Sequence, residues 1–139
     1  MKSLSEIETT SKRASRASGY SWGISEEVGK SIRLLEMFSF KGVKNLNEYL
    51  KEKKDKKFEN LNLITENNKC LKFSYCPIIL GVSFLDQIEN LEKIKKINFS
   101  KIAFPLLFLP FLSRSSEVIG KKISFKFEKN EFLLNINVN

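Results

Sequence analysis

The chain has 139 residues, which is the size of one ordinary domain, and its composition of 42% hydrophobic and 29% charged residues is typical of a globular protein. It has no histidine, which excludes Ser-His-Asp and Cys-His nucleophiles, imidazole metal ligands and an imidazole pH switch. Lysine and arginine number 24 against 16 acidic residues, so the formal net charge is +8. We therefore expect one domain over residues 1–139, with no cofactor and no metal site.

Three helices are predicted in the first part of the chain. The first covers about residues 3–17, because Ser3 and Glu6 form a capping box and Gly19 can end the helix in a left-handed conformation. The second covers about 22–40 and is capped by Ser21 or Ser25. Its helical spacing predicts one buried stripe, formed by Ile24, Val28, Ile32, Leu35 and Phe38. Lys41-Gly42 is expected to close this helix, and a third follows over about 45–57, opened by Asn45.

The apolar spacing changes to a period of two after residue 58. This pattern predicts a β-hairpin over 61–75, ended by Pro77, and a strand that contains Ile97 and Phe99. A short buried segment over 78–81 and a short helix over 85–91 are expected between them, with Asp86 as a cap. The apolar run 102–112 contains two prolines and predicts buried, mixed structure.

A second hairpin is predicted at the end of the sequence. Ile123, Phe125 and Phe127 alternate with polar residues, and so do the apolar residues of 132–138, on either side of a turn at Lys129-Asn130. The predicted fold class is α+β, with N-terminal helices followed by antiparallel hairpins and a short helix.

The charge and the cysteines give expectations about partners and compartment. Twenty of the basic residues are lysine and only four are arginine, whereas proteins that recognise nucleic acid favour arginine. Nucleic acid is therefore not the expected partner. The N-terminus has no secretory apolar region, and Cys70 and Cys76 form no C-x-x-C pair. The longest apolar run is far shorter than the roughly 20 residues that span a bilayer, so we expect a cytoplasmic protein with no membrane partner.

Two segments are candidates for a binding site. The first is the turn from Gly19 to Gly23 with Trp22, at the start of the second helix, which could bind an anion or could be a rigid turn with Trp22 packed in the core. Glu26, Glu27 and Arg33 follow on the same helix. Adjacent glutamates project about 100° apart, so these two do not form a general acid-base pair.

The second candidate segment contains Cys76 and Asp86. A reactive cysteine needs an electropositive, partly exposed setting, and the apolar neighbours of Cys76 favour a buried, structural cysteine instead. Capping is the expected role of Asp86.

Three stretches of the sequence resemble an uncharacterised bacterial family known as domain of unknown function 3726. The first, residues 17–43, carries the motif positions Ser21, Trp22, Gly23, Glu26, Glu27, Gly29, Arg33 and Gly42. The second is Cys76-Pro77 with Gly81 and Asp86, and the third is the proline-containing run 104–112. The resemblance implies a cytoplasmic protein of alphaproteobacterial type, and implies that the chain is short at its C-terminus.

These observations favour a binding or accessory module with no identifiable catalytic machinery, acting on a protein partner. The candidate binding residues are Trp22, Glu26, Glu27, Arg33, Cys76 and Asp86. One alternative is an enzyme or small-molecule-binding protein with a site near the Trp22 turn and the segment 76–86. Another is a weak nucleic-acid binder that uses the lysine excess.

Overall fold

The structure is a computed structural model in which residues 2–137 are described. The chain divides into two compact units, residues 1–56 and 57–139, which we call unit 1 and unit 2 and describe separately. Unit 1 is helical and unit 2 combines helices with a sheet, so the α+β class predicted from the sequence is confirmed. The single domain expected over 1–139 stays a prediction.

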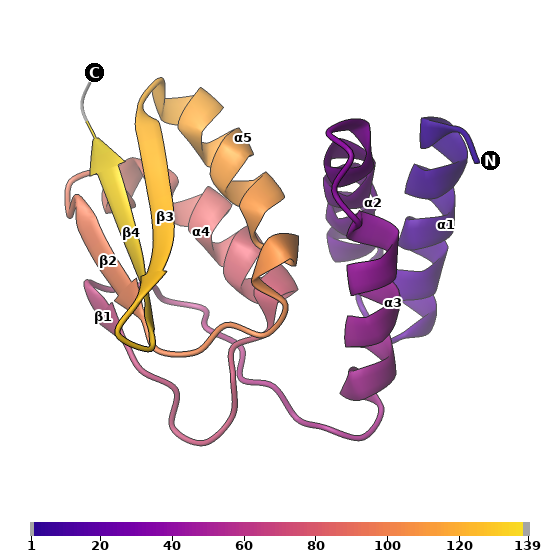
Figure 1. Ribbon diagram of the computed structural model, residues 1–139, viewed down its shortest axis with the longest axis horizontal. Helices are drawn as coiled ribbons and strands as arrows, with labels where there is room; N and C mark the ends of the chain where they lie inside the picture. Colours follow the sequence, from indigo (N-terminus) through magenta and orange to yellow (C-terminus); the bar gives the residue numbers. More distant parts are fainter. Residues whose placement is uncertain (1, 138–139) are drawn as a thin grey trace. The chain divides into compact units, whose positions relative to one another are not determined.

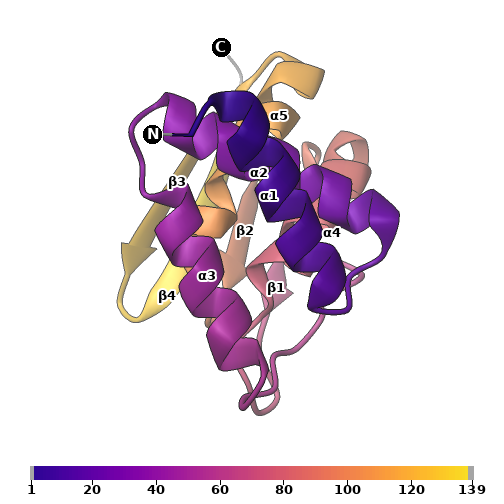
Figure 2. The same cartoon turned by 90° about the vertical axis from the view of Figure 1, so that its right-hand side faces the viewer.

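Unit 1 consists of α1 (Leu4–Ala17), α2 (Trp22–Met37) and α3 (Gly42–Lys53) (Figures 1 and 2). Ser3 caps α1 by accepting a hydrogen bond from the Glu6 amide, as the capping box predicts, and Gly19 after the helix has a φ of +106°. The predicted apolar stripe of α2 is buried at three positions, and two side chains of α3 join it in the buried set: Val28, Ile32, Leu35, Leu46 and Tyr49.

The turn between α2 and α3 differs from the prediction. α2 ends at Met37, three residues early, because Ser39 adopts a left-handed conformation with a φ of +63°. Phe38 is therefore not part of the buried stripe and is 66% exposed. Gly42 begins α3 and does not close α2. The Glu36 carboxylate accepts a hydrogen bond from the Val43 amide at 3.0 Å. A side chain of α2 thus pairs with one of the backbone amides that have no partner in the first turn of α3.

Unit 2 is a four-stranded sheet with two helices on one face (Figure 1). Within the described residues the strands are β1 (Asn67–Asn68), β2 (Lys96–Phe99), β3 (Lys122–Glu128) and β4 (Glu131–Asn137), in the order β1-β2-β4-β3. β1 is parallel to β2, and the other pairs are antiparallel. The helices are α4 (Pro77–Leu91) and α5 (Leu109–Ile119), with the short 3₁₀ helix η1 (Pro105–Leu107) before α5.

The core of unit 2 lies between these helices and the sheet. Phe108 is fully buried, and its ring packs edge-on against Phe84, Phe99 and Phe125, with centroids 5.4 to 5.9 Å apart. Gly81 of α4 allows α5 to approach, because a Cβ added there would lie 2.1 Å from the ring of Phe111.

The hairpin predicted over 61–75 is wrong. Only Asn67 and Asn68 form a strand there, and they pair with β2. Side chains form hydrogen bonds with backbone groups that would pair between the two strands of a hairpin. The Glu59 carboxylate accepts from the amides of Leu71, Lys72 and Phe73, and the buried Asn68 amide bonds both backbone groups of Thr65.

The region 76–119 is more helical than the sequence pattern predicts. Pro77 does not end a strand but occupies the first turn of α4, where a missing amide hydrogen costs nothing. The expected buried segment 78–81 and short helix 85–91 are one helix, so Asp86 is interior to it and is not a cap. The apolar run 102–112 is buried in part and mixed, as expected, and its end begins α5.

The second predicted hairpin is confirmed. β3 pairs with β4 in register from Lys122 and Asn137 to Glu128 and Glu131. Lys129 and Asn130 both have positive φ, which is typical of a two-residue type I′ turn. The last residue of the predicted strand, Val138, lies outside the described residues.

Candidate functional site

α1 and α2 of unit 1 form an antiparallel pair whose backbones approach closely. A Cβ added to Gly29 would lie 2.8 Å from the Glu8 carbonyl oxygen, so this position requires glycine. Small polar residues are also buried on these two helices, and they are Ser11, Ser15, Ser25 and Ser31. Gly29 of the family motif therefore has a packing role.

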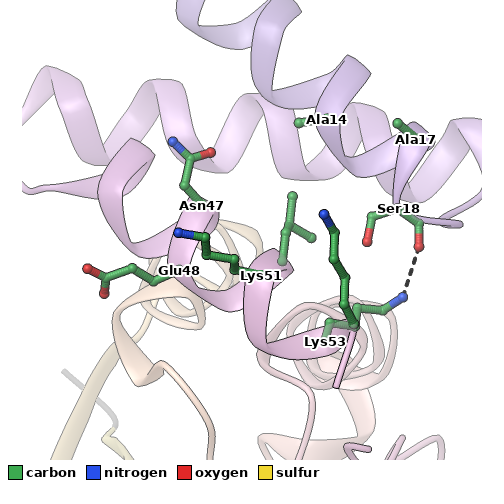
Figure 3. A pocket seen from close by; sticks show the side chains of 9 residues that line it. Ala14, Ala17, Ser18, Asn47, Glu48, Lys51 and Lys53 are labelled. Atoms are coloured by element: carbon green, nitrogen blue, oxygen red, sulfur yellow. Dashed lines mark hydrogen bonds between the residues drawn. The ribbon is translucent and has the colours of Figure 1, made fainter. Parts of the chain in front are cut away.

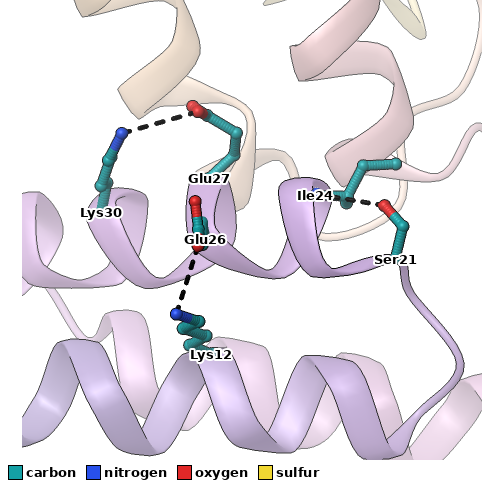
Figure 4. Close-up of polar contacts among 6 residues, drawn as sticks. All are labelled: Lys12, Ser21, Ile24, Glu26, Glu27 and Lys30. Atoms are coloured by element: carbon teal, nitrogen blue, oxygen red, sulfur yellow. Dashed lines mark hydrogen bonds and ion pairs between the residues drawn. The ribbon is translucent and has the colours of Figure 1, made fainter.

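The charged residues of the motif hold the same helix pair together. Arg33 pairs with Glu8 across α1 and α2 at 3.1 Å, and Glu26 pairs with Lys12 at 3.3 Å (Figure 4). Glu27 pairs with Lys30 on its own helix at 3.7 Å. In Figure 4 Glu26 is joined to Lys12 of α1 and Glu27 to Lys30 of α2, so the two carboxylates do not converge on one reacting atom.

Trp22 has a different environment from the other motif residues. It follows Ser21, whose hydroxyl caps α2 by accepting from the Ile24 amide at 3.2 Å (Figure 4), and its side chain is 57% exposed. Core packing, one alternative from the sequence, is therefore not what the structure shows. The Arg16 guanidinium lies 5.1 Å and the Lys12 ammonium 5.6 Å from the indole centroid.

Arg16 and Lys12 are themselves held in place. The Arg16 guanidinium donates to the Tyr20 carbonyl oxygen at 3.0 Å, and Lys12 is fixed by its pair with Glu26. The buried Tyr20 hydroxyl bonds that of Tyr49 at 2.9 Å, which ties the turn to α3. Trp22 is thus an exposed aromatic side chain on a rigid turn, beside two positioned cations.

The two predicted site residues of unit 2 are far apart along one helix. Cys76 is the N-cap of α4, where its buried Sγ accepts from the Ile79 amide at 3.5 Å, whereas Asp86 is exposed in the second half of α4. Ten residues of helix separate them by about 15 Å. Since Trp22, Glu26, Glu27 and Arg33 lie in unit 1, the alternative of a shared small-molecule site stays a prediction.

A groove that the sequence reasoning missed lies between α1 and α3 of unit 1 (Figure 3). Its volume is about 570 Å³, and its lining residues are Ala14, Ala17, Ser18, Asn47, Glu48, Leu50, Lys51, Lys53 and Lys54. The sequence shows a run of lysines over 51–57, at the end of the third predicted helix. No sequence signal indicated that α1 lies beside it.

Two titratable groups of unit 2 have shifted pKa values. Backbone amide donors lower the pKa of Glu59 below its ordinary value of 4.5, led by those of Lys72 and Phe73. Burial raises the pKa of Tyr75 to about 12, with smaller contributions from Cys70 and Glu59. At neutral pH Glu59 is therefore charged and Tyr75 is neutral. These shifts are consistent with structural roles for both side chains.

The described part of the chain gives two further findings. Across residues 2–137, no three acidic or cysteine side chains gather where they could hold a metal ion. In the same range, every helix is too short or too polar to cross a membrane.

Comparison with known proteins identifies a family. No curated protein and no solved structure matches the chain. The model of one protein family, described as protein of unknown function (DUF3726), matches residues 2–74, which is more than half of the chain and includes the helices α1, α2 and α3 of unit 1. The chain therefore belongs to the DUF3726 family.

Proposed function

We propose that the chain is a protein-binding module in which Trp22 is the anchor of the contact surface. The observation that carries this proposal is the exposure of the only tryptophan of the chain, at 57%, on a rigid helix start. Tryptophan and arginine are the residues most enriched at binding hot spots. Here Trp22 and Arg16 lie together, and the hydrogen bond from Arg16 to Tyr20 fixes their arrangement before any partner arrives.

The other motif residues support this assignment by contrast. Ser21 caps α2, Gly29 allows close packing, and Arg33 joins the two helices. Each of these roles is completed within the chain, whereas more than half of the Trp22 side chain faces solvent. The adjacent cations would favour a partner that presents an acidic group beside an apolar one.

The test compares Trp22→Ala with wild type in partner capture from cells that produce the protein. We expect the variant to lose the captured protein and to keep nearly the same thermal midpoint, because the indole is mostly exposed. Leu71→Ala is the matched control, since Leu71 is 96% exposed in unit 2. Titration of the purified partner then follows the fluorescence of Trp22, the only tryptophan of this chain.

Two results would contradict the proposal. A fall of many degrees in the thermal midpoint of Trp22→Ala would make the residue structural. Equal capture by wild type, Trp22→Ala and Leu71→Ala would show that Trp22 is not part of the contact surface.

A further inference from the structure

The groove between α1 and α3 combines an apolar floor with a basic rim. Ala14 and Ala17 of α1 and Leu50 of α3 contribute small or aliphatic side chains, so space remains between the two helices. Lys51 of α3 (Figure 3) and Lys54, the C-cap of α3, also line the groove. The groove thus has apolar surface that a bound group could cover and positive charges that it could pair with.

The lysines of the groove differ in whether their ammonium groups have a partner within the chain. The Lys53 ammonium donates to the Ser18 carbonyl oxygen at 3.0 Å and lies 4.8 Å from the centroid of the Tyr20 ring, so it fastens α3 to the end of α1 (Figure 3). Lys51 and Lys54 have no hydrogen-bond or ion-pair partner for their ammonium groups among residues 2–137. Two charges at the rim are therefore available to a bound group.

The spacing of the polar residues along α3 is compatible with a helix as the bound element. Lys51 and Lys54 are three residues apart and Asn47 precedes Lys51 by four. Since the C-cap Lys54 keeps a helical backbone conformation, the three residues continue one helical face along α3. A helix laid along this face would place carboxylates at the same spacing opposite the lysines. It would also cover the floor and complete a four-helix arrangement with α1, α2 and α3.

We propose that this groove binds an acidic amphipathic helix of a partner protein. The inference rests on the proposed function as a protein-binding module and assigns a second contact surface, separate from Trp22. Nucleic acid fits the groove less well. The lining residues contain no arginine, Glu48 lies among the lysines, and the apolar floor has no counterpart in a phosphate backbone.

The test measures binding of a labelled synthetic helix by fluorescence anisotropy at low ionic strength. The probe has about 20 residues, with leucine and alanine on one face and glutamates along its flank at spacings of three and four. We expect saturable binding to the full chain, and affinity about tenfold lower for the double variant Lys51→Glu/Lys54→Glu, because two attractions become repulsions.

The matched control is Lys69→Glu/Lys93→Glu, which changes the net charge equally but alters exposed lysines of unit 2. We expect it to bind the probe within about twofold of wild type. A probe with every glutamate replaced by glutamine should bind far more weakly. Circular dichroism of each variant verifies that the helices remain formed.

Four results would overturn the inference: no binding of the probe to wild type, equal losses in both double variants, equal binding of the glutamine probe, or tighter binding of a duplex DNA probe. Trp22→Ala should keep its affinity for the helix. A negative result for the groove would therefore not contradict partner binding through Trp22. Loss of partner binding in Trp22→Ala would likewise not contradict helix binding in the groove.

Discussion

Each unit of this chain contains one close packing contact, and the two contacts are built from different residues. In unit 1 the backbones of α1 and α2 approach at Gly29, and small polar residues such as Ser15 and Ser25 are buried on these two helices. In unit 2 the corresponding place between helices and sheet is filled by aromatic rings, centred on Phe108. The contact in unit 1 allows two backbones to approach, and the contact in unit 2 fills the space between helices and sheet with rings.

This difference determines how each unit responds to mutation. Where backbones are close, an added methyl group has no space to occupy and the cost is steric. Where large rings fill the space, removing one leaves a cavity and the cost is lost contact. The predictions below test this contrast.

The largest effect is expected from Phe108→Ala in unit 2. The substitution removes a fully buried ring that contacts three others, so we expect a loss of about 4 kcal/mol in the free energy of unfolding. Phe108→Leu should cost clearly less, since it leaves a smaller cavity. Hydrogen exchange measures the result, with the greatest loss of protection at the amides of β2 and β4. Similar protection in wild type and Phe108→Ala would show that this ring does not organise the core.

A smaller effect is expected from Gly29→Ala in unit 1. The new Cβ would meet the Glu8 carbonyl oxygen at 2.8 Å, and the gain of about 1 kcal/mol in helix propensity only partly offsets the displacement of α1. We expect a net loss of about 1–2 kcal/mol by chemical denaturation. Gly23→Ala is the matched control on the same helix, because a Cβ there has no atom within 4 Å. It should be neutral or slightly stabilising, and an equal loss in both variants would refute close packing at Gly29.

The sequence predicted those elements in which local pattern and tertiary environment agree. The stripe with Val28, Ile32 and Leu35 specified α2 by its spacing, and the alternation around Lys129-Asn130 specified the second hairpin. The α+β class followed from these elements. Of the candidate site, the sequence indicated that Trp22 begins a helix, but it did not indicate that Arg16 and Lys12 of α1 lie beside the indole.

Prediction failed where side chains from a distance decide the backbone. Leu71 and Phe73 alternate with polar residues as in a strand, but Glu59, twelve and more residues earlier, bonds their amides and holds a loop. Pro77 was interpreted as the end of a strand because no local signal indicated that Cys76 caps a helix. The groove between α1 and α3 depends on helix packing, which a pattern along one chain does not contain.

The smallest effect is expected from Glu59→Gln, and it should depend on pH. The amides of Leu71, Lys72 and Phe73 lower the pKa of Glu59 in the folded chain, so its charged form stabilises the fold at pH values above the ordinary 4.5. That contribution is lost as the pH falls through the lowered pKa, when the carboxylate takes up a proton and its negative charge disappears.

We therefore expect Glu59→Gln to melt slightly below wild type at pH 7, and the gap between them to close as the solution is acidified below pH 4.5. Glu66→Gln is the control, because that exposed side chain has no hydrogen bond or ion pair among the described residues. Thermal melts across this pH range measure both variants. A gap that stays constant with pH would mean that the negative charge of Glu59, and with it the charge assistance of its three hydrogen bonds, contributes nothing to the stability of unit 2.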